Sequence, residues 1–349
     1  MAKIDSLFEE LMAKGGSDLH LEQGQKPKIR LHGKLEELGG QEIFTEESIS
    51  ELLKEIASEE SWNHFIDLGD LDFAYALGHE ARFRANYFRH FFGYGAIFRL
   101  IPSKILTLDE LGMPEVLKGF AQIRSGLILI TGPTGSGKST TLAAIIDHIN
   151  TIQNKKIITI EEPVEFMHTN KSCLITHREV GLDTQSFASG LKGAIKSDAN
   201  IILVGEMRDQ ETIRLALKAA EMGILVFGTL HTNSAGKTID RVVDVFPTNQ
   251  KNQIRTTLAN TLRSVVAQQL LRSADGSGRH SAYEILMRTS ALSSIIMSGE
   301  TMRLISEIQL NRQKGMILMD DCLRQLVQDG KVTQDEAYMK ALDKAAFMR

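Results

Sequence analysis

Apolar residues recur with two different periods along the chain, and the change of period divides the chain in two. From residue 4 to 12 they follow the i, i+3, i+4 spacing of one helix face, and Gly15-Gly16 ends that pattern. Alternating segments at residues 28–32 and 82–88 predict strands, and a second helical pattern runs from residue 49 to 65. We therefore expect a small α+β domain at residues 1–101.

Short apolar runs alternate with helix-length segments from residue 126 onwards. The runs cover residues 127–131, 157–160, 201–204 and 224–229, and residues 282–286 offer a further strand. This is the spacing of βαβ units, so a mostly parallel sheet is expected. A polar loop is expected at residues 273–278, and the pattern is helical from residue 290. Pro102 and Pro114 bracket an expected linker at residues 102–117, which leaves an α/β domain at 118–349 with a helical part from about residue 289.

Charge and cysteine content narrow the classes of function. The chain of 349 residues carries 40 basic and 44 acidic side chains, a net charge of −4, which argues against a nucleic-acid binder. Its two cysteines, Cys173 and Cys322, lie far apart and form no CxxC pair, so neither a zinc module nor a disulfide framework is expected. The first residues lack an apolar signal core, and no apolar run is long enough to span a bilayer. A reducing, cytoplasmic location is therefore expected, with any membrane association made through a partner.

The strongest motif fits GxxxxGK[ST] in full and lies between an apolar run and a helical segment that begins near Thr140. Its residues are Gly132, Pro133, Thr134, Gly135, Ser136, Gly137, Lys138 and Ser139. In this context the pattern predicts a loop whose backbone amides hold nucleotide phosphates at a helix N-terminus. Lys138 is expected to reach the β- and γ-phosphates, and Ser139 to ligate Mg²⁺. The expected substrate is ATP.

Polar residues follow three of the predicted strands. Because the carboxyl ends of parallel strands share one sheet edge, Glu165, Glu206 and His231 are expected to converge near Lys138. Glu206 stands where a Walker B acid holds Mg²⁺, Glu165 is the candidate general base, and His231 the candidate sensor of the γ-phosphate. Each of these residues has an alternative role as a helix cap, a solvated loop charge or a hydrogen-bonded loop histidine.

Hydrolysis also needs positive charge on the transferred phosphate, and the N-terminal domain is rich in arginines interleaved with aromatic residues. They are Arg82, Arg84, Arg89 and Arg99. The alternation of Arg82, Phe83 and Arg84 also fits a solvated strand face above an apolar one, and the set also fits a patch for an acidic partner. Both alternatives stay open beside an arginine-finger role.

These motifs together resemble the type IV pilus retraction ATPases, a branch of the secretion ATPases, nearly from end to end. The resemblance rests on Arg82-Phe83-Arg84, the phosphate loop, and the segments at residues 16–20, 161–165, 173–181, 203–209, 228–235 and 240–247. It implies a PAS-like N-terminal domain, a RecA-like ATPase domain and a hexameric ring docked on an inner-membrane platform protein. A paralogous retraction ATPase is a further expected partner. The family resemblance also favours Arg84 and Arg99 as fingers, and it implies pilus disassembly and twitching motility.

Three positions depart from the family pattern. Glu162 replaces the aspartate of the Glu-Asp-Pro box, and Phe92 stands where a loop arginine is usual. The retraction motif, usually AIRNLIRE, corresponds to residues 291–298, where the apolar spacing survives without the arginines, the asparagine and the glutamate. An accessory retraction ATPase, an assembly or secretion ATPase, a regulatory subunit with little turnover and a RecA-like translocase are the alternatives.

Overall fold

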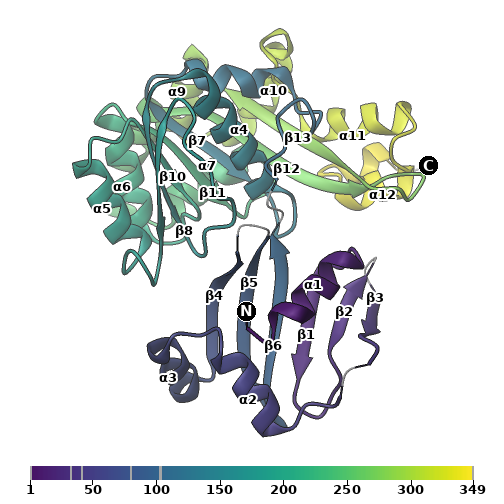
Figure 1. The fold of residues 1–349 in the computed structure, drawn as a ribbon. Coiled ribbons are helices and arrows are strands. Elements are labelled where there is room, and N and C mark those ends of the chain that lie inside the picture. Colours follow the sequence, from purple (N-terminus) through teal and green to yellow (C-terminus); the bar gives the residue numbers. More distant parts are fainter. Residues whose placement is uncertain (1, 32–33, 41, 79–80, 102–103, 348–349) are drawn as a thin grey trace. The chain divides into compact units, whose positions relative to one another are not determined.

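The computed structural model describes residues 2–31, 34–40, 42–78, 81–101 and 104–347, which form two compact units (Figure 1). The smaller unit comprises Met1–Lys104 with Glu162–Met167, and the larger comprises Ile105–Glu161 with His168–Arg349. Pro102, one of the two prolines expected to bracket a linker, lies outside the described residues.

The smaller unit is built on a six-stranded antiparallel sheet. Its strands are β1 (Asp18–Glu22), β2 (Lys28–Leu31), β3 (Lys34–Glu37), β4 (Asp70–Leu77), β5 (Ala81–His90) and β6 (Gly93–Ile101). They lie in the order β3-β2-β1-β6-β5-β4. Alternation along β5 buries Phe83, Ala85 and Tyr87 in the core and leaves Arg84 on the opposite, polar face.

Three helices supply the rest of this core: α1 (Asp5–Ala13), α2 (Glu46–Lys54) and α3 (Glu59–Leu68). Phe8 of α1 stacks on Phe83 with ring centroids 4.1 Å apart. The single helix expected at residues 49–65 is wrong, because the chain forms α2 and α3 instead. Ser58 accepts a hydrogen bond from the amide of Ser61 and so caps the start of a new helix.

The larger unit contains a seven-stranded sheet in the order β13-β12-β7-β11-β10-β8-β9. The strands are β7 (Gly126–Thr131), β8 (Lys156–Glu161), β9 (Leu174–Glu179), β10 (Ile201–Val204), β11 (Leu225–Leu230), β12 (Leu262–Arg272) and β13 (Arg279–Met287). All neighbours pair in parallel except β12 and β13. The mostly parallel sheet is confirmed, and so are the five expected strands. The sequence analysis missed β9 and β12.

Helices cover both faces of this sheet. The 3-10 helix η1 (Glu115–Gln122) and α4 (Lys138–Ile152) pack on one face. The other face carries α5 (Phe187–Lys196), α6 (Gln210–Glu221), α7 (Ala235–Asp244), α8 (Thr248–Thr261), α9 (Ser290–Ser298) and α10 (Leu304–Leu310). The result is a three-layer α/β/α unit, as the predicted fold class requires.

The C-terminal helices pack against the end of the β12–β13 hairpin that carries its turn (Figure 1). They include α11 (Met319–Gln328), α12 (Gln334–Lys340) and η4 (Lys344–Phe347), and two short 3-10 helices, η2 (Thr301–Arg303) and η3 (Arg312–Lys314), precede them. The polar loop expected at residues 273–278 joins β12 to β13. Across the described residues, no helix is both long and apolar enough to cross a bilayer.

Candidate nucleotide site

The glycine-rich loop connects β7 to α4, as the motif predicts. Gly137 is the N-cap of α4 and has a φ of 86°, in the left-handed region that suits glycine. A side chain at Gly132 would place its Cβ 2.2 Å from the carbonyl oxygen of Gln268, so only glycine fits there. The Lys138 ammonium donates to the carbonyl oxygens of Gly132 (2.8 Å) and Pro133 (3.1 Å).

This loop has the features of a phosphate cradle. Pro133, Thr134 and Gly135 are exposed, whereas Ser136 is buried. The Ser136 hydroxyl has no hydrogen-bond partner among the residues that the structure describes. Ser139 and Thr140 lie in the first turn of α4, where the helix dipole favours anions. The donor set therefore fits nucleotide phosphates.

Gln268 of β12 supports the start of α4 and was missed by the sequence analysis. Its Oε1 accepts a hydrogen bond from the Thr141 hydroxyl at 2.7 Å, and both side chains are buried. The signal for it was present in the sequence, because Gln268-Gln269 interrupts an otherwise apolar run, and buried amides need partners.

Glu206 and His231 meet at the carboxyl edge of the sheet. Glu206 follows β10, His231 follows the neighbouring strand β11, and His231 Nε2 lies 3.0 Å from Glu206 Oε1. Arg208 also contacts Glu206 Oε1. Partial burial opposes ionisation, but Arg208 and His231 outweigh it and hold the pKa of Glu206 below its usual value. The carboxylate is therefore ionised at neutral pH, as a metal ligand must be.

Steric contacts explain why the residue before Glu206 is a glycine. A Cβ at Gly205 would lie 3.2 Å from both the Ile160 carbonyl oxygen and the Glu161 Cα. The Gly205 amide also donates to that Ile160 oxygen at 2.8 Å. Because both neighbours are backbone atoms of β8, they cannot move aside easily. A larger residue would push the turn that carries Glu206 away from the sheet edge.

The other predicted catalytic residues belong to the smaller unit. Glu165 lies in the segment Glu162–Met167, which groups with that unit. Arg84 on β5 and Arg99 on β6 are direct cross-strand partners, so they share the polar face. Arg99 donates from Nε to Asp18 Oδ1 at 2.8 Å, and Asp18 is buried. Within the smaller unit the structure pairs the two arginines, and within the larger unit it pairs Glu206 with His231.

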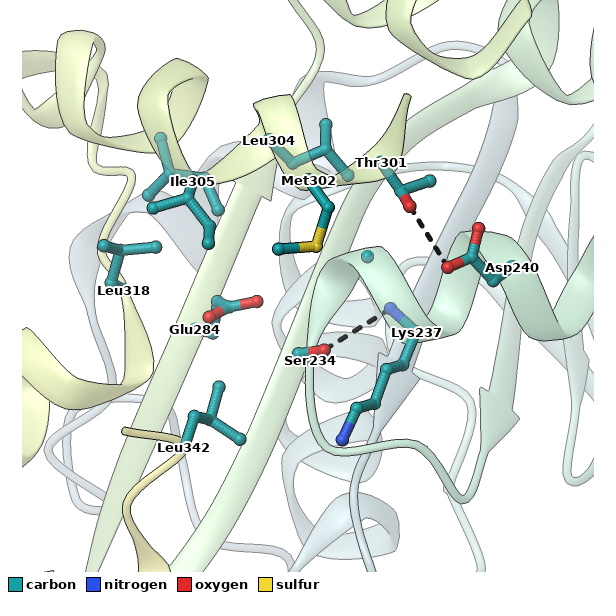
Figure 2. A pocket seen from close by; sticks show the side chains of 12 residues that line it. Ser234, Lys237, Asp240, Glu284, Thr301, Met302, Leu304, Ile305, Leu318 and Leu342 are labelled. Carbon is teal, nitrogen blue, oxygen red and sulfur yellow. Dashed lines mark hydrogen bonds between the residues drawn. The ribbon is translucent and has the colours of Figure 1, made fainter. Parts of the chain in front are cut away.

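A pocket of about 170 Å³ opens beside the start of α7, four residues after His231 (Figure 2). Glu284 of β13 lies in its wall and is 5% exposed. Its carboxylate accepts hydrogen bonds from the amides of Ala235 (2.7 Å) and Met319 (3.4 Å), the first residues of α7 and α11. Burial raises the pKa of Glu284, and these two amides oppose that rise. Sequence analysis missed this link, because it joins elements far apart in the chain.

Comparison with known proteins extends over nearly the whole chain. The family model described as type II/IV secretion system protein matches residues 1–339. The type IV pilus retraction ATPase PilT of Pseudomonas aeruginosa is 46% identical over 338 residues, 97% of this chain and 98% of the relative. PilU, a type IV pilus ATPase of the same organism, is 34% identical over 97% of this chain and 88% of its own length.

A twitching motility protein of Neisseria gonorrhoeae is 43% identical over 90% of this chain and 84% of its own length. Among solved structures, the pilus retraction motor PilT with bound ADP matches with a TM-score of 0.91 and 38% identity, over 99% of this chain and 98% of that one. The ATPase DotB of Legionella pneumophila matches with a TM-score of 0.80 and 26% identity, over 96% of this chain and 94% of that one. These matches confirm the resemblance to retraction ATPases.

Proposed function

Because the chain belongs to the type II/IV secretion system protein family, we propose that it is an ATP-hydrolysing motor that drives type IV pilus retraction. The observation that carries this proposal is the complete phosphate loop between β7 and α4, with the Glu206–His231 pair at the same sheet edge. The similarity to retraction ATPases over nearly the full length supports type IV pilus retraction as the process that hydrolysis drives.

The phosphate loop binds the nucleotide in this account. The backbone N–H groups of residues 134–140 face the phosphates, and the Lys138 ammonium leaves the Gly132 and Pro133 carbonyls for the β- and γ-phosphate oxygens. The exchange is favourable because each phosphate oxygen carries more negative charge than a carbonyl oxygen does.

Mg²⁺ would be held by the Ser139 hydroxyl and, through water, by Glu206. Among the described residues no three His, Cys, Asp or Glu side chains cluster as an all-protein metal site. That pattern suits Mg²⁺, which in phosphoryl-transfer sites takes few protein ligands beside phosphates and water. When bound, the ion would neutralise charge that develops on the phosphates.

The remaining roles are assigned by chemistry. Glu165 acts as the general base that orients and deprotonates water, and His231 senses the γ-phosphate through its contact with Glu206. Arg84 and Arg99 supply positive charge to the transferred phosphate, supported by their pairing on one exposed sheet face.

The proposed assembly is a hexameric ring in the cytoplasm, docked on a pilus platform protein at the inner membrane. The similarity to PilU supports a paralogous retraction ATPase as a further partner. Serines replace charged residues of the retraction motif in α9, and Met297, which replaces an arginine, is exposed. This altered surface favours an accessory motor as the second candidate function.

Purified variants test the ATPase assignment. Lys138→Ala should reduce hydrolysis to below about 1% and weaken nucleotide binding, since the phosphates lose their cation. Glu165→Gln should retain binding of labelled ADP but lose cleavage. Lys196→Ala, at an exposed position of α5, is the matched control and should keep wild-type turnover. Hydrolysis by Lys138→Ala at the wild-type rate would refute the assignment.

A further inference from the structure

The segment that carries Glu165 is hydrogen-bonded near both of its ends to strand β9 or to the residue that follows β9. At the entrance, the Val180 amide donates to the Glu161 carbonyl oxygen at 2.9 Å and extends the β8–β9 ladder. At the exit, the His168 amide donates to Nε2 of His177, a β9 residue, at 3.1 Å. Glu162–Met167 lies between these two anchors. The exit anchor is a side chain and can therefore be changed without altering the backbone ladder.

The His177 ring is itself held in one orientation. Its Nδ1 lies 2.9 Å from the hydroxyl of Thr159, a fully buried residue of β8. His177 Nε2 lies 3.1 Å from the His168 amide nitrogen and 3.4 Å from the His168 carbonyl oxygen. With the shorter contact as the hydrogen bond, Nε2 accepts, because a backbone amide can only donate, and the imidazole proton lies on Nδ1, from where it is donated to Thr159. The neighbouring His168 ring stacks on His177 with centroids 5.8 Å apart and an interplanar angle of 11°.

These contacts form a chain from the core of the sheet to the C-terminal end of the Glu162–Met167 segment. Thr159 fixes His177, and His177 fixes the His168 backbone, three residues after Glu165. A general base must be held within hydrogen-bond reach of its water, and a displacement of about 1 Å costs on the order of a hundredfold in rate.

We propose that His177 is a positioning residue for Glu165. Its neutral imidazole connects the core of the sheet to the segment that carries the base and restrains that segment. The inference rests on the proposed function and concerns the same reaction. His177 touches neither nucleotide nor water in this account. It acts through the His168 amide and lowers the entropy of the Glu162–Met167 segment.

Substitution of His177 by glutamine or by asparagine tests the contacts of the two ring nitrogens one at a time. In His177→Gln the side-chain oxygen reaches the position of Nε2 and still accepts from the His168 amide, whereas in His177→Asn the amide reaches only the position of Nδ1 and keeps the Thr159 contact alone. We expect kcat to fall about tenfold in His177→Asn and less than about twofold in His177→Gln, with KM and ADP affinity unchanged in both. Amide hydrogen exchange in peptides covering residues 162–168 should accelerate in His177→Asn only.

The outcome distinguishes this inference from the proposed function. Equal kcat values for His177→Asn and wild type, or equal losses in the Asn and Gln variants, would overturn the positioning role. The proposed function would stand in both cases if Glu165→Gln still abolished wild-type cleavage. Absence of hydrolysis in the wild type itself would instead refute the function. In the Glu165→Gln background, His177→Asn should have no further effect on the residual rate, since both changes act on the same step.

Discussion

His231 Nε2 lies 3.0 Å from Glu206 Oε1, and this contact joins the loops that follow two neighbouring parallel strands, β10 and β11. Four residues after His231 begins α7, whose first amide is bound by the buried carboxylate of Glu284. His231 therefore links the turn that carries Glu206 to the segment that leads into α7.

The Glu206 carboxylate should determine the magnesium dependence of hydrolysis. Glu206→Gln removes the negative charge that attracts the hydrated ion, so the Mg²⁺ concentration for half-maximal rate should rise at least about tenfold. His231→Ala should lower kcat and leave that concentration unchanged. The measurement is ATP hydrolysis titrated with Mg²⁺, and an unaltered titration midpoint in Glu206→Gln would remove this residue from the metal site.

Gln268 should matter for both stability and nucleotide affinity. Gln268→Ala leaves the Thr141 hydroxyl buried without its partner, which should lower the free energy of unfolding by about 1–3 kcal/mol and weaken ADP binding several-fold. The matched control is Gln269→Ala, which breaks a hydrogen bond from Nε2 to the Lys340 carbonyl oxygen at the C-terminal helices. Both variants should lose stability in chemical denaturation, but only Gln268→Ala should lose ADP affinity. Equal affinities would contradict the role of Gln268 in the cradle.

Gly205→Ala should damage catalysis through the backbone. The added methyl group meets β8 backbone atoms at 3.2 Å, so the turn that carries Glu206 must shift. We expect a loss of at least about tenfold in kcat, because sub-ångström placement of the metal ligand is lost. At Gly278, in a polar loop of the same unit, an added Cβ meets no atom within 4 Å. Steady-state rates of the two alanine variants provide the comparison, and equal rates would show that the turn tolerates the methyl group.

The stability of the larger unit should fall in mild acid. Burial, reinforced by the nearby His177, lowers the pKa of His168 from 6.5 to about 4. Between these values the unfolded chain binds a proton that the folded chain excludes, so this contribution is fully present above pH 6.5 and is lost as the pH falls towards 4.

From pH 7.5 to 5.0 the loss from His168 alone is about 2 kcal/mol. Urea unfolding of wild type and His168→Leu at both pH values measures it, because leucine cannot titrate. The leucine variant should show a pH dependence smaller by that amount. Identical pH dependences would mean that protonated His168 is accommodated in the fold.

In the larger unit, the strands that sequence alone predicted are those buried on both faces, because such strands read as continuous apolar runs. Strand β10 is an example, with all four residues buried. Strand β12 was missed because Ser264, Gln268 and Gln269 interrupt its apolar run, and each is satisfied by a distant partner. Strand β9 lies at the sheet edge and carries polar residues, among them His177. Period alone could not identify either strand.

The candidate site likewise contains parts that the sequence predicted and parts that it did not. The glycine-rich loop is local in sequence, and its place between a strand and a helix was predicted from the motif. Parallel strand order correctly predicted that Glu206 and His231 meet, and their expected approach to Glu165 and Lys138 stays a prediction. Gln268, Glu284 and His177 act through contacts between residues far apart in the chain, which no local pattern records. The proposed roles of Glu165, Arg84 and Arg99 stay predictions that mutagenesis must test.

The most direct test of a ring motor is the ATP hydrolysis rate of the purified chain across protein concentrations, with particle mass measured in parallel. For a ring motor, turnover per chain should rise together with a species of six times the 38.8 kDa chain mass, and Glu165→Gln should form the same species without turnover. A stable monomer that hydrolyses ATP at full rate would contradict the ring, and one that binds nucleotide without turnover would favour a regulatory subunit over a motor.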